Sequence, residues 1–594
     1  MLATIFGIIL ILIPFLLVFS FSDRRQGFLY VFSAVLILHS FIALFTQFFH
    51  LFSYTNLIMI HSLIACLVIG FFIYRFKQFK FNFKLNFLVI LGFLIVFFNF
   101  YSVHFFYNGY IATINHDQKQ VDQSVYQYPY FSDEWIGVAW INYTIDNNEL
   151  PIKNPLIDKH DSYFPNIFIG FFSLISEIFL ILNVNPLTAY IFVSLAFNLI
   201  LCFLFFLLLR VHRVNSFIAL LATLFIPYIT NGSNLPGTWY FIPFSMGLIT
   251  ILLNFIFLEL KKPKIAFLIG VFSLFLYPPF LVFVIPAFLI YFFSHHSLKD
   301  YISKKTIGIT ISSLLLIVFL IIYSQPENAK TLWQILFNSF WRLNLDGGIP
   351  TFYPWLILPL VIFPFTIFGF VKLIKEKKYY IFITTLISFS LWGFYMISQY
   401  YIFIDYARVV IFSALLLLFL FGLGLEYLLN KFIEKSNLKI SKTFIVFFKI
   451  IIIFCFFILS LFYTSSNNWE KLKLKSYQTS DFYLSPNPPA NFYLHQDDIS
   501  LFSGITKSRF LAPPWKALVV GVATNNYPLH SKASIITNNY LDYYSFIDSP
   551  CEDKKKLAKK HKIVYVYSNY FVCDGFTEVG NSNEGLYLYK FNDK

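Results

Sequence analysis

The chain has 594 residues, of which 58% are hydrophobic and only 12% are charged, and its formal net charge is +14. Apolar runs of about 20 residues, the length that a helix needs to cross a bilayer, recur between Met1 and Tyr463. This composition excludes an ordinary soluble domain and predicts a polytopic α-helical membrane protein. The positive charge does not indicate nucleic-acid binding, because the basic residues gather in short links between the apolar runs and orient them.

The distribution of these basic links predicts which side of the membrane each link faces, because Lys and Arg are enriched in cytoplasmic links. The N-terminus, the 108–186 loop and everything after residue 465 are then outside, and about 14 helices cross the membrane. We expect a plasma (inner) membrane protein with N-terminal transmembrane helices over 1–107 and a transmembrane helical domain over 187–464. The expected spans are 2–21, 27–49, 54–74, 86–107, 187–209, 215–230, 239–259, 265–277, 280–294, 306–323, 356–371, 379–398, 407–427 and 444–464.

The 108–186 loop contains Asp133 and Glu134 directly before Trp135. Any single acid in such a loop is more often a solvated surface group than a catalyst. Here the residues from Trp135 to Ile145 can form an amphipathic helix whose tryptophans favour the membrane interface. An acid at the start of that helix would be held near the lipid head-groups as a carboxylate. Asp133 is therefore predicted to be a general base that takes a proton from an acceptor hydroxyl, with Glu134 positioning the acceptor or the base.

The apolar run 164–182 does not fit the topology, in which successive links between spans lie on opposite sides of the membrane. It is long enough to cross, but the loop before it and the span ending at Arg210 both require its two ends to be outside. We interpret it as an interfacial or re-entrant helix along the outer leaflet. The alternative is a real span that is paired with another, miscounted one.

Arg408 lies just inside the outer boundary of the expected span 407–427, where an uncompensated cation is costly and usually functional. A base such as Asp133 needs an electrophile with a good leaving group, and a lipid phosphate can reach the outer surface through the membrane. The Arg408 guanidinium could hold such a phosphate with two hydrogen bonds, and Arg342 is a weaker candidate. The alternative is that Arg408 pairs with Asp405 or extends to the surface.

The segment 465–594 loses the long apolar runs and is predicted to be a small extracytoplasmic α/β domain of about one hundred residues. Its expected strands are 517–523, 533–537 and 562–567, and its expected helix is 552–560. Cys551 and Cys573 flank this helix and the strand after it, so they form either a disulfide in an oxidising compartment or two unpaired thiols.

The 128–186 region resembles the first extracytoplasmic loop of the C-type glycosyltransferases (GT-C superfamily), which are multi-spanning enzymes that use polyprenyl-phosphate-linked sugars. The tail resembles the outer domains of many of these enzymes, in which a lysine-rich helix precedes a strand such as 563–567 and a further strand, here 585–590, ends the chain. The segments that carry the loop resemblance are 132–135, 149–155, 160–165 and 182–186.

The resemblance implies that Asp133 matches the catalytic acid of the family, with Glu134 as its neighbour or substitute. It also implies an inverting displacement at the anomeric carbon, with polyprenyl phosphate as the leaving group and an extracytoplasmic glycan, lipid or protein as acceptor. The product would carry one transferred hexosyl or pentosyl unit. His160 and Asp161, beside the 164–182 helix, are possible substrate-binding residues, as are Trp135 and Asp405.

Two departures from the family pattern affect this interpretation. The loop usually follows the first span, whereas about four spans precede it here. The link 231–238 contains no acid, so the second acidic motif that helps to bind metal in oligosaccharyltransferases has no counterpart. No metal ligand is assigned, and a divalent cation as cofactor has no support in the sequence. The competing hypotheses are a transporter or flippase of lipid-linked glycans and a cell-envelope assembly scaffold.

Overall fold

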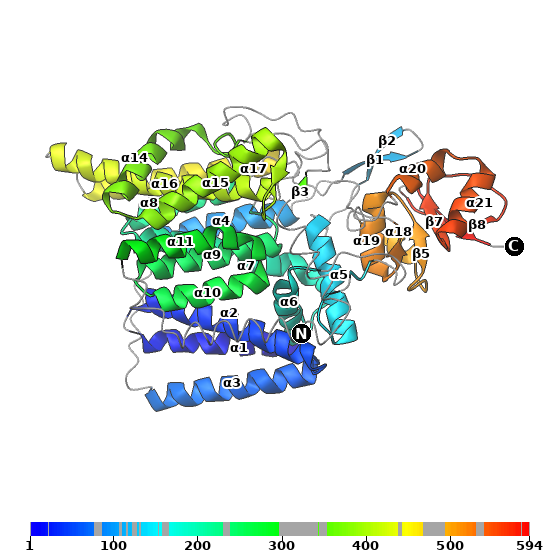
Figure 1. Ribbon diagram of the computed structural model, residues 1–594, viewed down its shortest axis with the longest axis horizontal. Coiled ribbons are helices and arrows are strands. Elements are labelled where there is room, and N and C mark those ends of the chain that lie inside the picture. The colour runs from blue at the N-terminus through cyan, green and yellow to red at the C-terminus, as the bar shows by residue number, and fades with distance from the viewer. Residues whose placement is uncertain are drawn as a thin grey trace.

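The protein is mostly helical, with a small sheet domain at its C-terminus (Figure 1). Within the part of the chain that the computed structural model describes, six helices are long and apolar enough to cross a membrane, and seven further apolar helices are shorter. The expected span 306–323 lies outside the described residues, so the expected total is not tested. The described residues are 2–21, 23–75, 86–105, 110–114, 117–121, 128–129, 132–152, 154–156, 166–229, 238–295, 342–343, 353–436, 442–466, 494–529, 540–583 and 585–592.

One edge of the helical bundle is formed by α1 (Leu2–Leu12), which continues as the 3-10 helix η1 (Ile13–Ser20), and by α2 (Arg24–Phe48) and α3 (Tyr54–Arg75) (Figure 1). Helix α4 (Phe87–Phe105) lies apart from this edge and packs against later helices of the bundle (Figure 1). Large apolar side chains cover the outward side of α3 and are exposed. Exposed apolar surface on this scale is what a helix presents to lipid. These side chains include Met59, Leu63, Leu67 and Ile73.

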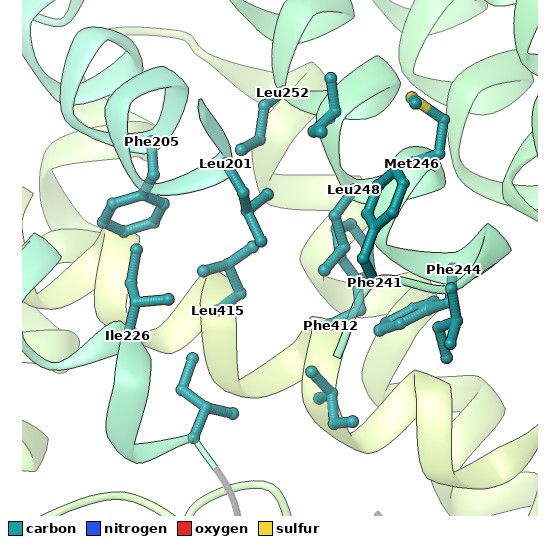
Figure 2. Close-up of a cluster of buried hydrophobic side chains, with 14 of the residues drawn as sticks. Leu201, Phe205, Ile226, Phe241, Phe244, Met246, Leu248, Leu252, Phe412 and Leu415 are labelled. Atoms are coloured by element: carbon teal, nitrogen blue, oxygen red, sulfur yellow. The ribbon is translucent and has the colours of Figure 1, made fainter. Parts of the chain in front are cut away.

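The larger group of helices packs around α16 (Tyr406–Ser436), which is buried over 94% of its most apolar stretch. Figure 2 shows part of this core, where side chains of α7, α9 and α16 meet. The labelled members are Leu201, Phe205, Ile226, Phe241, Phe244, Met246, Leu248, Leu252, Phe412 and Leu415. The helices that pack against α16 include α7 (Pro186–Val211), α8 (Ser216–Leu224), α14 (Phe363–Lys375) and α15 (Tyr379–Ser398). The other helices of this group are α9 (Pro243–Glu259), α10 (Pro263–Leu276), α11 (Leu281–His295) and α17 (Lys442–Ser466).

Two helices of the 108–186 loop, α5 (Ser132–Asn147) and α6 (Ile169–Leu182), run across one end of the bundle, between it and the C-terminal domain (Figure 1). The helix expected from Trp135 onward is present, but its amphipathic character was predicted wrongly. Trp135 is 0% and Trp140 is 5% exposed, so both tryptophans pack in the protein core instead of facing a membrane interface. Packing by α6, α7 and α19 covers the faces of α5 that the sequence pattern left for lipid.

Helix α6 corresponds to the apolar run 164–182 and is shorter than expected. Its 14 residues extend about 21 Å, less than the hydrocarbon thickness of a bilayer. Its side chains are buried on almost every side, against α2, α5 and α10. Helix α6 therefore packs among the other helices of the protein, and its interfacial or re-entrant placement in the membrane stays a prediction.

The C-terminal domain contains a five-stranded sheet in the order β6-β5-β7-β9-β8. Strand β5 is parallel to β6 and β7, and β9 is antiparallel to β7 and β8. The strands are β5 (Arg509–Leu511), β6 (Tyr527–Pro528), β7 (Tyr565–Ser568), β8 (Phe576–Asn581) and β9 (Tyr587–Phe591). The helices are α18 (Gln496–Leu501), α19 (Pro514–Thr524), α20 (Tyr540–Asp548) and α21 (Cys551–Lys560).

The predicted helix 552–560 and the strand within 562–567 are present as α21 and β7. The predicted strand 517–523 is wrong, because this segment is the helix α19. A short apolar run cannot be assigned to helix or strand by periodicity, and Pro514 at the first helical position favours the helix. The predicted strand 533–537 lies outside the described residues. Cys551 and Cys573 form a disulfide, with their Cα atoms 5.3 Å apart.

Candidate functional site

Asp133 and Arg408 form an ion pair where α5 meets α16. The distance from Arg408 Nη2 to Asp133 Oδ2 is 2.9 Å, and Arg408 Nη1 lies 3.2 Å from Asp405 Oδ1. The alternative expected for Arg408, a pair with Asp405, is thus present together with the contact to Asp133. The side chains of Asp133, Arg408 and Asp405 are 21%, 23% and 32% exposed, so the group is accessible to a ligand.

The local sequence explains why these groups lie at helix ends. Asp133 is in the first turn of α5, where a carboxylate interacts favourably with the helix dipole. Asp405 precedes α16 and its Oδ1 accepts the backbone N–H of Ala407 at 2.9 Å, which satisfies one free N–H of that helix. The ion pair therefore brings two helix N-termini together, and helix N-termini favour bound anions.

Glu134, beside Asp133 in the sequence, has a different environment. It is 0% exposed, and its Oε1 accepts the backbone N–H of Phe241 at 3.1 Å and the hydroxyl of Ser194 at 3.2 Å. Tyr190 donates a hydrogen bond to the carbonyl of Phe241 at 2.7 Å. Glu134 therefore fixes the first turn of α5 to α7 and to the segment before α9.

The other residues predicted for the site are placed as follows. Arg342 lies in the short strand β3 (Arg342–Leu343), where it pairs in register with Tyr401 of β4 (Tyr400–Tyr401), so its backbone runs beside the segment that leads to Asp405. Trp135 is enclosed in the core, and we assign it no contact with substrate. His160 and Asp161 lie outside the described residues.

Tyr277 is a neighbour of the site that sequence reasoning missed. It follows α10, and its hydroxyl lies within electrostatic range of Arg408, Asp405 and Asp133. The side chain is 2% exposed, and its ring stacks on Phe168 just before α6. The uncharged link around Pro278 was expected outside, but no local signal distinguishes this tyrosine from its neighbours.

The C-terminal domain packs on α5 through α19. Asp146, near the end of α5, has an exposed side chain and interacts electrostatically with Lys507 of the domain. Partial desolvation raises the pKa of the Asp146 carboxyl from its usual 3.8, and the nearby Lys507 ammonium partly opposes that shift. One helix thus carries the acid of the site at its start and a domain contact near its end.

A metal ion would need several His, Cys, Asp or Glu ligand atoms close together. Among the described residues, the group with that spacing is His39, His61 and Glu177, which does not include Asp133 or Asp405. The described part of the Asp133–Arg408 site therefore provides an acid and a cation but no such group of metal ligands.

Comparison with known proteins gives structural matches only. A structure of the Archaeoglobus fulgidus oligosaccharyltransferase, tethered with an acceptor peptide containing the NVT sequon, has 13% sequence identity and a TM-score of 0.44, and the match covers 85% of this chain and 74% of that chain. The archaeal oligosaccharyltransferase AglB from the same organism, in complex with an inhibitory peptide and a dolichol-phosphate, has 11% identity and a TM-score of 0.42, covering 81% and 69%. No protein-family model and no curated protein match the chain.

Proposed function

We propose that the protein is an integral membrane glycosyltransferase that transfers one sugar from a polyprenyl-phosphate donor to an extracytoplasmic glycan, lipid or protein acceptor. The observation that carries the proposal is the Asp133–Arg408 pair, which joins the starts of α5 and α16 and is partly open to a ligand. The sequence alone gave each residue a separate role, a base and a phosphate-binding cation. A glycosyl transfer from a lipid phosphate needs these two roles side by side.

Arg408 binds the donor phosphate in this proposal. A guanidinium has five N–H donors in a planar arrangement, so it can contact more than one anion at once. Its Nη1 faces Asp405 and its Nη2 faces Asp133. A phosphate that displaces Asp405 would be bound by Arg408 and by the N-terminus of α16, while Asp133 keeps its place. Arg342, whose strand pairs beside Tyr401, is a second candidate for the same phosphate.

Asp133 then acts on the acceptor. The acceptor oxygen forms a bond to the anomeric carbon, and the bond from that carbon to the phosphate oxygen breaks, with its electron pair leaving on polyprenyl phosphate. The acceptor proton goes to the Asp133 carboxylate. Attack from the side opposite the leaving group inverts the anomeric centre. Arg408 stabilises the negative charge that develops on the phosphate, which is where electrostatic catalysis has its largest effect.

Glu134 is a positioning residue in this scheme. It is buried and accepts hydrogen bonds from the Phe241 backbone N–H and the Ser194 hydroxyl. These bonds hold the first turn of α5 in place, while the Asp133 side chain contacts Arg408. The C-terminal domain contacts the same helix through α19, and it would cover the acceptor side of the site. We place this end of the bundle outside the cell, in agreement with the basic links expected in the cytoplasm.

The test is transfer of radiolabelled sugar from a panel of polyprenyl-phosphate sugars in membranes that contain wild type, Asp133→Asn or Asp146→Asn. Lipid-linked oligosaccharides are included, because the structural matches are oligosaccharyltransferases. We expect wild type and Asp146→Asn to label a product, and Asp133→Asn to be slower by about 100- to 10,000-fold, the range that general acid–base catalysis contributes.

Asp146 is the matched control because it lies on the same helix but at the domain contact. Equal transfer by wild type and Asp133→Asn, at equal amounts of inserted protein, would show that Asp133 is an ordinary loop acid. Absence of transfer from every donor would favour a transporter of lipid-linked glycans. The first outcome would overturn the role of Asp133 as the base, and the second would overturn the proposed function.

A further inference from the structure

A second cluster of ionisable side chains lies inside the bundle, away from the Asp133–Arg408 pair. His39 of α2, His61 of α3 and Glu177 of α6 converge on one point. His61 Nε2 lies 2.6 Å and His39 Nδ1 lies 3.1 Å from the same oxygen, Glu177 Oε1, and the two imidazole rings stack with their centroids 4.6 Å apart. Two consecutive helices and the distant helix α6 thus meet through ligand-type atoms.

The cluster lies well inside the helices. His61 is seven residues from the start of α3, about 10 Å along its axis, and His39 is nine residues from the end of α2, about 14 Å. These two helix ends are joined by the short link 49–53, so both distances are measured from the same end of the bundle. Ionisable side chains at such depth in apolar helices are costly and usually functional.

One strong hydrogen-bond acceptor of the buried cluster, a carboxylate oxygen of Glu177, has no hydrogen-bond partner among the described residues. The side chains of His39, His61 and Glu177 are 7%, 3% and 0% exposed, and Glu177 Oε2 has no hydrogen-bond partner in the structure. A buried carboxylate oxygen without a partner costs more free energy than almost any other polar atom. The nearby hydroxyls of Ser173 and Ser176 on the same helix also lack partners.

We propose that His39, His61 and Glu177 form a binding site for a divalent transition-metal ion of the Zn²⁺ type. Two imidazole nitrogens and the two oxygens of one carboxylate make four ligand atoms, which is the number in a closed zinc site. Ligand atoms around tetrahedral zinc are about 3.3 Å apart, and the three ligand atoms here already lie within 4.8 Å of one another. Rotation of the carboxylate would bring the unpaired Oε2 to the ion.

The ion would fasten the first helices of the chain to the helix that supports the site. Helix α6 packs on α5, and α2 and α3 contact α6. Binding there needs neutral imidazoles and an ionised carboxylate, and it would add a cross-link among helices that are far apart in sequence. This inference is independent of the proposed function, because bound metal is measured without any transfer reaction.

The experiment measures metal content by mass spectrometry in protein purified in detergent with added Zn²⁺ and then dialysed against metal-free buffer. Wild type should retain about one ion per chain. Glu177→Gln and His39→Gln should each bind more than about 100-fold more weakly, since even residues that only orient ligands contribute about 10- to 100-fold. His50→Gln is the matched control, because His50 is exposed and its Nδ1 lies 3.1 Å from the Asn148 carbonyl, outside the cluster.

Wild type is also titrated with Co²⁺, whose visible absorption reports coordination by imidazole and carboxylate. Because this titration uses wild type alone, it remains informative if a variant fails to fold. A Co²⁺ spectrum that Zn²⁺ displaces, together with metal loss in both cluster variants, supports the site. Wild type that binds neither Zn²⁺ nor Co²⁺ would show that the cluster only shares protons between imidazole and carboxylate. Metal that persists in both variants would place the ion elsewhere, and either result overturns the proposal.

Discussion

The two clusters of ionisable side chains beside α5 and α6 differ mainly in their access to solvent. The Asp133, Arg408 and Asp405 side chains are 21% to 32% exposed, whereas those of His39, His61 and Glu177 are at most 7% exposed. The open cluster lies at helix starts, and the closed cluster lies two or three turns inside the helices. An open cluster can exchange one anion for another during turnover.

A closed cluster cannot exchange partners cheaply, because a buried polar group that loses its hydrogen-bond partner has no water to replace it. The difference in exposure shows that an ionisable residue in a membrane protein is not by itself evidence for catalysis. Substitutions in the open cluster should change activity and leave stability nearly unchanged. Substitutions in the closed cluster should change stability first.

Replacement of Glu177 by Leu should have the largest effect on stability. It leaves two buried imidazoles without the oxygen that both contact, and each buried polar group left without a partner costs about 1–3 kcal/mol. We expect a clear fall in the melting temperature of the detergent-purified protein. Glu376→Leu, at a carboxylate that is 41% exposed, is the control and should melt close to wild type. Equal melting temperatures for both variants would remove the distinction between the two clusters.

Replacement of Arg408 by Gln should lower transfer by about 100- to 1,000-fold, which is about 2.7–4 kcal/mol in transition-state stabilisation. The melting temperature should change little, because the pair is partly exposed and such pairs contribute about 0–1 kcal/mol. Arg408→Lys should recover part of the rate, since it restores the charge without the planar array of donors. Arg25→Gln, an exposed arginine outside the site, controls for net charge. A large loss of stability in Arg408→Gln would show that the Asp133–Arg408 pair mainly stabilises the fold, as the buried cluster does.

Glu134 provides a sharper comparison, because it adjoins Asp133 in sequence but is buried like Glu177. Glu134→Leu leaves the backbone N–H of Phe241 without its acceptor, which should cost about 1–3 kcal/mol. Glu134→Gln retains an acceptor oxygen and should keep most of the stability and of the transfer rate. The measurements are melting temperature and initial rate for both variants. A complete loss of transfer in a stable Glu134→Gln protein would instead make Glu134 a chemical participant.

The smallest effect is expected at Asp146, where α5 meets the C-terminal domain. Its folded-state pKa is raised by partial desolvation, so the folded protein holds this proton more tightly than the unfolded chain. The stabilisation from this proton is therefore fully present below the usual pKa of 3.8. It is lost as the pH rises through the raised pKa of the folded protein. Asp146→Asn should remove this part of the pH dependence. Melting curves for wild type and variant across that range measure the difference, and parallel curves would exclude the effect.

The sequence predicted features that depend on neighbouring residues. The helix 552–560, the strand within 562–567 and the presence of a helix in 164–182, though not its shorter length, follow from local composition. Asp133 and Arg408 were chosen as an acid before a helix and a cation near a span boundary, but their contact spans 275 residues and no local pattern predicts it.

What the sequence did not predict depends on tertiary packing. Helix α19 was expected as a strand because an apolar run fits either structure, and Trp135 was expected at the membrane surface because other helices cover it only in the folded protein. His39 and His61 have no metal-ligand spacing with each other in the chain. They become a cluster only because Glu177 of α6 lies between α2 and α3.

The most direct test of the account is binding of polyprenyl phosphate, the proposed leaving group, to wild type, Asp133→Asn and Arg408→Gln in the same lipid nanodiscs. If Arg408 holds the phosphate and Asp133 takes the proton, Asp133→Asn should bind at least as tightly as wild type, because it frees the guanidinium from one competing anion. Arg408→Gln should bind about tenfold more weakly or worse. Equal weakening in both variants, or none in Arg408→Gln, would contradict this division of roles.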